Sequence, residues 1–232
     1  MRDQKSRLRG YLEAERQKLE SLTGRQKLRY IIDYYWLWIL GVFGAVFILG
    51  YVIYHAAFAV KDFWFYAVFA NTMGDGGNGS RLYTDFVDYA GFDTSQKKVE
   101  MNASSWFDPS VKGGTVNSYY QAFVALVESG DLDIVVMGKE GLRSVGSSGR
   151  LLDLSDEKCA AIYEKYGGRL VTCEPYDEEY SGGPVPVGID ISDSRLVTEY
   201  ELYEGDCVLG ISAYSSRISS VEVFLDFILM EE

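Results

Sequence analysis

The side chains best suited to chemistry in this chain are carboxylates, and several lie close together in one segment. Residues 174–184 read EPYDEEYSGGP, with acids at Glu174, Asp177, Glu178 and Glu179. Carboxylate oxygens are the ligands that Ca²⁺ prefers, but the spaced ligands and the glycine of an EF-hand loop are missing. A run of charges is also typical of a solvated loop, and we predict no metal site here. A glycosidase needs only two carboxylates, although the small size of the domain argues against one.

Two other features narrow the chemistry further. His55 is the only histidine, and it lies at the end of a long apolar run. Ser-His-Asp and Cys-His catalysis and histidine-based zinc sites are therefore excluded beyond that run. The Gly-rich stretch 71–80 (NTMGDGGNGS) lacks the lysine of a phosphate-binding loop, and Asp75 would repel phosphate. Because clusters of Gly, Asn and Asp are typical of turns, we predict a flexible turn there. From the missing catalytic and phosphate-binding residues we predict that the chain is not an enzyme and uses no cofactor.

The three cysteines, Cys159, Cys173 and Cys207, all follow the apolar run. An odd number allows at most one internal disulfide. Cys173 and Cys207 both fall in expected strands, so they are the candidate pair. Pairing Cys159 with Cys173 instead would close a loop of about 15 residues, worth ~3 kcal/mol in the chain-entropy model. Three buried, reduced thiols are the third alternative.

Charge is divided unevenly along the 232 residues. Residues 1–29 hold nine basic and four acidic side chains, a net charge of +5. Residues 61–232 hold 13 basic and 29 acidic side chains, a net charge of −16. Phosphate binding needs clustered Lys and Arg, so this acidic part is not expected to bind nucleic acid.

Between these parts lies a stretch that predicts a membrane span. Residues 34–60 contain no Asp, Glu, Lys or Arg, and about 20 apolar residues cross a bilayer as a helix. Aromatic residues gather at both ends, as at membrane–water interfaces. More basic residues precede the run than follow it, which places the N-terminus in the cytoplasm by the positive-inside rule. Gly41 and Ala45 match the small-xxx-small pattern of paired membrane helices.

The predicted organisation has three parts. They are a cytoplasmic basic amphipathic helix within 1–29, a transmembrane signal-anchor helix over 30–62, and an extracytoplasmic domain over 63–232. The amphipathic segment could lie on the inner leaflet or serve only as a topology signal. A cleaved signal peptide, cut after Ala59, is the alternative, but signal h-regions are only ~7–15 residues long. We predict a single-pass protein of the cell membrane with an extracellular C-terminal domain and the lipid bilayer as a partner.

The domain after the membrane run shows strand patterns that alternate with helical ones. Helical periodicity over 115–129 places Tyr119, Phe123, Leu126 and Val127 on one face. Alternation of this kind predicts an α/β sandwich with a mostly parallel sheet. Strands are expected over 63–70, 97–102, 131–138, 170–173, 185–191 and 207–214, and helices over 81–90, 115–129, 139–148, 156–166 and 215–230.

Three stretches of this domain resemble the extracytoplasmic solute-binding proteins of ABC importers in a shortened form. They are the helix and strand of 119–138, the turn GRLLDL of 149–154, and the terminal strand and helix of 210–229. The likeness implies one lobe of a periplasmic-binding-protein fold without the usual lipobox cysteine. The whole chain also resembles uncharacterised membrane proteins of Gram-positive, Clostridia-type bacteria.

The resemblance implies a ligand at the carboxyl ends of the parallel strands. The side chains expected there are polar or aromatic. They are Asn71, Thr72, Ser104, Trp106, Lys139, Asp190, Ser192 and Tyr214. Trp106 could stack on a ring of a ligand or belong to the core.

Two functions remain open at this point. The first is a membrane-anchored extracytoplasmic module that binds or senses a small solute or peptide without catalysis. The second is an accessory subunit that docks on another membrane protein and binds no small ligand. A concave pocket with convergent polar groups favours the first, and an exposed apolar patch favours the second.

Overall fold

The computed structural model describes residues 23–58, 62–175 and 183–230, and the chain divides into two compact units, Met1–Ala59 and Val60–Glu232. The predicted amphipathic helix lies mostly outside the described residues, as do the cleavage position after Ala59 and the carboxylates Asp177–Glu179.

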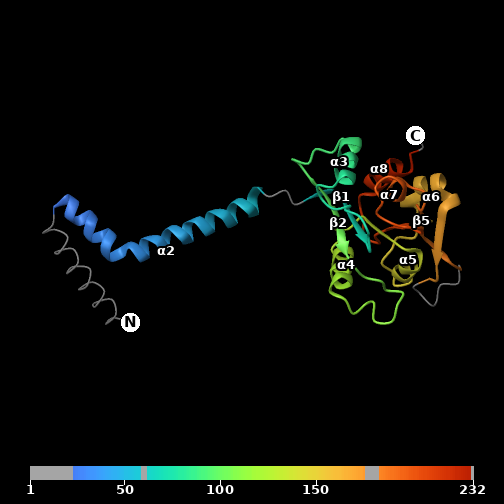
Figure 1. Ribbon diagram of the computed structural model, residues 1–232, viewed down its shortest axis with the longest axis horizontal. Coiled ribbons are helices and arrows are strands. Elements are labelled where there is room, and N and C mark those ends of the chain that lie inside the picture. The colour runs from blue at the N-terminus through green and yellow to red at the C-terminus, as the bar shows by residue number, and fades with distance from the viewer. Residues whose placement is uncertain (1–22, 59–61, 176–182, 231–232) are drawn as a thin grey trace. The chain divides into compact units, whose positions relative to one another are not determined.

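The first unit contains the helix α2, Gly24–Phe58, drawn in blue in Figure 1. Its segment Tyr35–Tyr54 is long and apolar enough to cross a membrane, and no residue of its most apolar window is buried. A soluble core helix would bury one face, so exposure along this length agrees with a single membrane anchor. The helix crosses the predicted boundary at residue 29 without a break.

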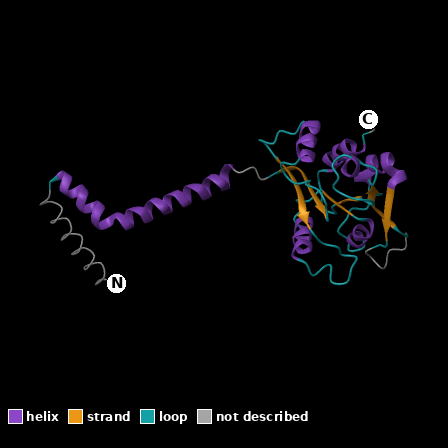
Figure 2. Ribbon diagram, viewed as in Figure 1, coloured by secondary structure: helices purple, strands orange, loops and turns teal. Residues whose placement is uncertain are grey.

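The second unit is a mixed six-stranded sheet with helices on both faces (Figure 2). Its strands are β1 (Phe63–Ala70), β2 (Lys98–Ser105), β3 (Ile134–Met137), β4 (Leu170–Cys173), β5 (Val185–Asp190) and β6 (Val208–Ile211). Its helices are α3 (Arg81–Ala90), α4 (Ser118–Glu128), α5 (Lys139–Gly146), α6 (Ala160–Tyr166), α7 (Arg195–Thr198) and α8 (Ile218–Leu229), with short 3₁₀ turns η1 (Glu157–Cys159) and η2 (Gly167–Arg169). The predicted α/β architecture is confirmed at this level.

The strand order is β2-β1-β3-β6-β5-β4. The pairs β1–β2 and β1–β3 are parallel, whereas β3–β6, β6–β5 and β5–β4 are antiparallel. The sheet is thus mixed rather than mostly parallel. The strands β1, β2, β3 and β5 run in one direction, and β6 and β4 run in the other.

Strand residues alternate between two apolar layers, as the pleat requires. Phe65 and Phe69 of β1 face the layer that also contains buried residues of α3, α6, α7 and α8, while Val68 faces the layer of α4 and α5. The rings of Phe65, Phe86 and Phe224 lie 5.0–5.1 Å apart and join β1, α3 and α8. Burying one such ring contributes about 1.5–3 kcal/mol.

Candidate functional site

The carboxyl ends of β1, β2 and β3 meet at one edge of the sheet, where Asn71 organises the backbone. Asn71 follows β1 with a φ of 58°, a left-handed conformation that asparagine tolerates. Its Nδ2 donates to the carbonyl of Phe107 at 2.8 Å, and its Oδ1 accepts from the Phe107 amide at 3.0 Å. Both bonds hold the loop that follows β2 against the end of β1.

Two adjoining hollows lie beside this junction. The first encloses about 240 Å³ between the ends of β1 and β3, and the second encloses about 660 Å³ beside the segment that follows α7. They share Met73, Tyr203 and Glu204, so we treat them as one feature, the carboxyl-edge groove. Its lining is Ala70, Asn71, Met73, Gly74, Asp108, Met137, Gly138, Gly141, Val197, Tyr200, Glu201, Tyr203, Glu204 and Asp206.

The charged residues that line the carboxyl-edge groove are all acidic: Asp108, Glu201, Glu204 and Asp206. Asp206 Oδ2 accepts from the amide of Lys139 at 3.0 Å and so caps the start of α5. Asp108 Oδ1 accepts from the amide of Ser110 at 2.9 Å. These bonds hold two of the carboxylates in place, and four acids without a basic neighbour in the lining create a field that attracts cations.

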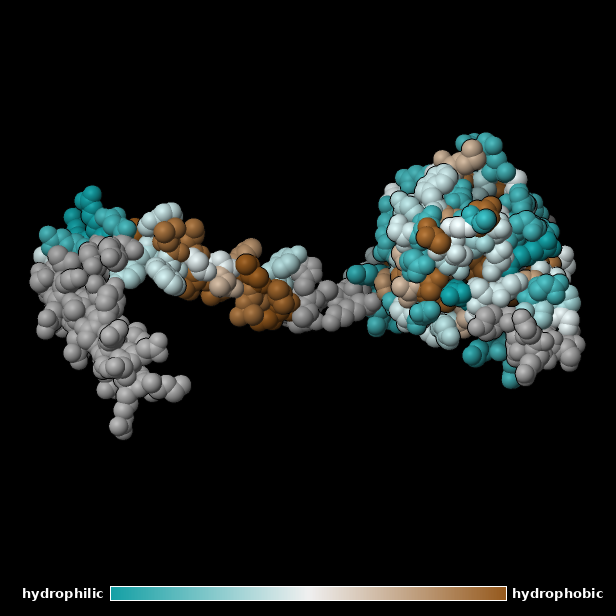
Figure 3. All heavy atoms as spheres, turned by 90° about the horizontal axis from the view of Figure 1, so that it is seen from below, coloured by the Kyte–Doolittle hydropathy of each residue, from teal (hydrophilic) through white to brown (hydrophobic). Residues whose placement is uncertain are grey.

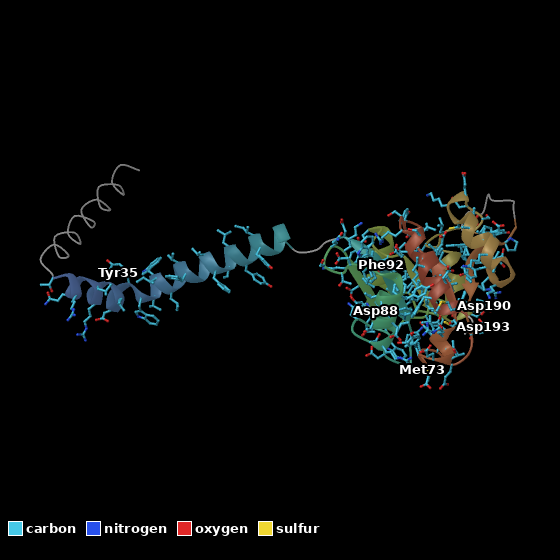
Figure 4. The ribbon with its side chains drawn as sticks, turned by 90° about the horizontal axis from the view of Figure 1, so that it is seen from above. Tyr35, Met73, Asp88, Phe92, Asp190 and Asp193 are labelled. Carbon is cyan, nitrogen blue, oxygen red and sulfur yellow. The ribbon has the colours of Figure 1, made fainter. Side chains whose placement is uncertain are left out.

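The groove also has an apolar side. Met73 is 66% exposed, and Figure 4 shows it at the margin of the domain, apart from Asp190 and Asp193. Beneath it Tyr203 is buried and donates its hydroxyl to the carbonyl of Val136 at 2.9 Å. Burial raises the pKa of Tyr203 well above its ordinary value. The phenol therefore stays neutral and forms a fixed wall.

The described residues do not contain three His, Cys, Asp or Glu side chains placed to hold a metal ion. The carboxylates of the groove are therefore not gathered at one metal site. Single carboxylates form charge-assisted hydrogen bonds with ammonium and guanidinium groups.

Of the eight residues predicted for the ligand site, Asn71 alone lines the groove. Lys139 contributes its backbone amide to Asp206 at the groove's border. Trp106 is 55% exposed on the loop after β2 and lines neither hollow. Ser104 lies in β2, where its amide donates to Asn102 Oδ1 at 2.9 Å.

Asp190 and Ser192 form a local turn at the end of β5. Asp190 Oδ1 accepts from the Ser192 amide at 3.1 Å and from its hydroxyl at 2.6 Å. The Ser192 hydroxyl also accepts from the amide of Cys207 at 3.0 Å. These polar atoms join β5 to the start of β6, so they serve the sheet rather than the groove.

Tyr214 lies at the opposite edge of the sheet from the groove. The prediction assumed that the strand before it runs parallel to the others, but β6 is antiparallel to β3. The carboxyl end of β6 therefore meets the amino end of β3, where Tyr214 lies beside Gly130. For this topological reason, Tyr214 does not lie at the carboxyl ends of the parallel strands, where it was expected.

Thr72 and the Gly-rich loop close the outer edge of β2. The Thr72 hydroxyl donates to the carbonyl of Ala103 at 2.9 Å. Asn78 accepts from the Met101 amide through Oδ1 at 2.8 Å, and its own amide donates to the Met101 carbonyl at 3.1 Å. Residues 71–80 therefore cover the outer edge of β2 through hydrogen bonds, and they protect an edge strand from pairing with other chains.

The three cysteines are buried, free thiols. The candidate Cys173–Cys207 disulfide is not formed, and the alternative of three reduced thiols agrees with the structure. Cys173 lies in β4 and Cys207 directly precedes β6, two strands that β5 separates, and the two residues belong to different apolar layers. Cys173 lies opposite Val185 in the pairing of β4 with the start of β5. The backbone carbonyl of Cys207 instead accepts from the amide of Ile191, beyond the end of β5. A disulfide needs Cα atoms within about 7 Å.

The edge of the sheet opposite the groove holds a buried ion pair. Asp133 is fully buried and accepts from Arg217 Nε at 2.9 Å, the Ser215 hydroxyl at 2.6 Å and the Tyr66 amide at 2.8 Å. Every bond ties β3 to β1 or to the turn before α8. We interpret this cluster as structural.

The sequence does not mark the groove acids as a group, because Glu201, Glu204 and Asp206 fall between expected elements. The short helix α7 and the turn after it bring them beside β1 and β3.

Comparison with family models, with curated proteins and with solved structures found no match for the chain.

Proposed function

We propose that this chain is a membrane-anchored binding or sensing module whose outer domain holds a cationic solute or peptide in the carboxyl-edge groove. The observation that carries the proposal is the groove itself, with four carboxylates and no lysine or arginine in its lining. Its joined hollows fall in the size range of small-ligand sites, about 300–1,000 Å³. Met73 and the tyrosines would contact the apolar part of the ligand.

The proposal includes the orientation and the family likeness expected from the sequence. The positively charged N-terminal segment stays in the cytoplasm, and the acidic domain over 63–232 lies outside. A single lobe like that of a solute-binding protein has no second lobe to close over its ligand, so its groove stays open to solvent. Open grooves suit reversible binding and sensing.

We propose binding without a chemical step. The groove offers carboxylates, but the chain's one histidine, His55, lies within α2 and not in the outer domain. The thiols are buried in the two apolar layers. A general base paired with a nucleophile, as acyl transfer requires, does not line the groove.

The test is a thermal-shift titration of the full chain in detergent with Lys-Ala-Lys, Glu-Ala-Glu and glucose. A ligand at 100 times its Kd adds about 2.7 kcal/mol of stability, so saturable stabilisation by Lys-Ala-Lys alone supports the proposal. The double variant Glu201→Gln/Glu204→Gln should lose it, while the exposed control Glu164→Gln should keep it. Equal responses to all three probes, or none to the cationic one, would reject the cationic groove.

A second function, an interaction subunit without a small ligand, is favoured by a separate observation. Exposed apolar side chains gather on the segment 106–119 rather than in the groove. Exposed apolar patches mark contacts with other proteins.

A further inference from the structure

Large apolar side chains are exposed on the loop after β2 and on the first turn of α4. They are Trp106 (55% exposed), Val111 (56%), Val116 (87%) and Tyr119 (46%), and we call them the α4 patch. Among the described residues of the outer domain, nine large apolar side chains are exposed, and these four lie within one short segment. Figure 3 looks from the side on which α4 lies in Figure 1, and it shows apolar side chains reaching the surface of the domain.

The α4 patch is held in place by an ordered backbone. Asn117 caps α4 by accepting from the Tyr119 amide at 2.8 Å, and its Nδ2 donates to the carbonyl of Trp106 at 2.8 Å. The two ends of the loop are thereby joined. A Cβ on Gly114 would lie 1.7 Å from the carbonyl oxygen of Asp108, so the loop between them is closely packed on itself.

The neighbouring aromatic residues already fill the core beneath the patch. Phe107 and Tyr120 are buried with Phe123, and the Phe107 and Phe123 rings stack 5.2 Å apart. Trp106 and Tyr119 therefore face outward because the interior positions beside them are taken. Their exposure is a property of the fold.

Charge distinguishes this surface from the rest of the domain. Residues 106–127 contain one acid, Asp108, and one base, Lys112, a net charge of zero, whereas residues 61–232 carry a net charge of −16. Two such domains repel each other wherever acidic faces meet. A basic partner would be drawn to the acidic groove, and an acidic partner would be repelled by the domain as a whole.

We propose that the α4 patch is a self-complementary contact between the outer domains of two copies of this chain in the same membrane. A second copy presents the same apolar surface with a net charge of zero, so apolar area is buried without bringing two acidic faces together. Anchoring both copies in one membrane raises their effective concentration. A modest patch is then sufficient for association.

The test is cysteine crosslinking of the full chain in native membranes. In a two-fold contact, a residue near the axis meets its own counterpart. Under mild oxidation, Val116→Cys and Tyr119→Cys should give a reducible dimer about tenfold more abundant than Glu164→Cys, which lies on α6 in the other helix layer. Dimer levels equal to those of the control would overturn the proposal.

A second variant tests the patch without crosslinking. Trp106→Glu places a charge in the contact and should weaken association of the full chain in detergent, measured by sedimentation, by about tenfold or more. The melting temperature should stay unchanged, because the side chain is exposed. In the cysteine-crosslinking experiment, a product that contains a different protein would overturn the second copy as the occupant of the patch. It would favour the accessory-subunit function. The outcome is independent of the groove, because Trp106 does not line it.

Discussion

At the scale of single residues, Asp133 is the most constrained charge in the outer domain. Burial, as the largest effect, raises the pKa of Asp133, while bonds from Ser215, Arg217 and Tyr66 oppose the rise. Arg217 also donates through Nη2 to the carbonyl of Asp131 at 2.5 Å. One guanidinium thus connects the start of β3 with the turn before α8.

We expect Arg217→Met to destabilise the outer domain by about 3–5 kcal/mol, because it leaves a buried carboxylate without its counter-charge. The matched control is Arg169→Met, which removes the exposed pair between Arg169 and Asp193 and should change stability by less than about 1 kcal/mol. Urea unfolding of both variants measures the difference. Equal losses of unfolding free energy in the two variants would show that Arg217 is not needed to stabilise the buried carboxylate of Asp133.

The buried thiols predict a loss of stability at alkaline pH. Burial, as the largest effect, raises the pKa of Cys159 to about 11 and also raises that of Cys173 and Cys207. An unfolded thiol titrates near pH 8.5. The unfolded chain therefore releases these protons first, so the thiols' contribution to stability is present below about pH 8.5 and is lost as the pH rises toward the folded pKa.

The triple variant Cys159→Ala/Cys173→Ala/Cys207→Ala should lose less stability than the natural chain between pH 8.5 and pH 10. Chemical unfolding at several pH values in that window measures this. Alkylation provides the cross-check, since all three thiols should react after denaturation and remain protected before it. Only one reactive thiol in denaturant would indicate a disulfide instead.

At the scale of elements, the sequence predicted most helices because their apolar residues recur with a clear period. The predicted bounds of 81–90 match α3, and Val221, Phe224, Leu225 and Ile228, which recur at helical spacing, are buried in α8. In α4 the inward residue is Tyr120, whereas Tyr119 is exposed. Periodicity alone could not distinguish adjacent tyrosines, since the choice depends on where Phe107 packs.

Other features of the fold and site depended on long-range contacts. Asp156 caps the turn before α6, and the four-residue α7 was not predicted. The direction of β6 could not be inferred from its apolar residues, because a fully buried strand reads alike in either direction. The antiparallel direction of β6 places Tyr214 at the end of the sheet opposite the groove. The groove acids were missed for the same reason, as only the tertiary fold brings them together.

The close packing of α5 on the sheet gives a prediction at this scale. A Cβ on Gly188 of β5 would lie 2.4 Å from Leu142 Cδ2 of α5 and 2.7 Å from Val208 Cγ1 of β6. We expect Gly188→Ala to destabilise the domain by about 1–3 kcal/mol through overpacking. The control Gly168→Ala meets no atom within 4 Å and should be nearly neutral. Thermal unfolding compares the two, and a neutral Gly188→Ala would mean that α5 moves aside easily.

At the scale of the whole molecule, the chain combines an apolar helix with an acidic, self-contained domain. The unit Val60–Glu232 has its own two apolar layers around one sheet. The groove and the α4 patch both belong to this unit and involve no shared lining residue. Ligand binding and association can therefore be tested separately.

The proposed orientation is tested by labelling intact cells with a membrane-impermeant maleimide. The native thiols are buried, so a single introduced cysteine should dominate the signal. Glu164→Cys, exposed in the outer domain, should be labelled in intact cells. Ser6→Cys, in the basic segment before the membrane helix, should be labelled only after the cells are opened, because Lys- and Arg-rich flanks stay in the cytoplasm. The reverse pattern would place the acidic domain inside the cell and would remove the basis for an extracellular ligand, since the groove would then face the cytoplasm.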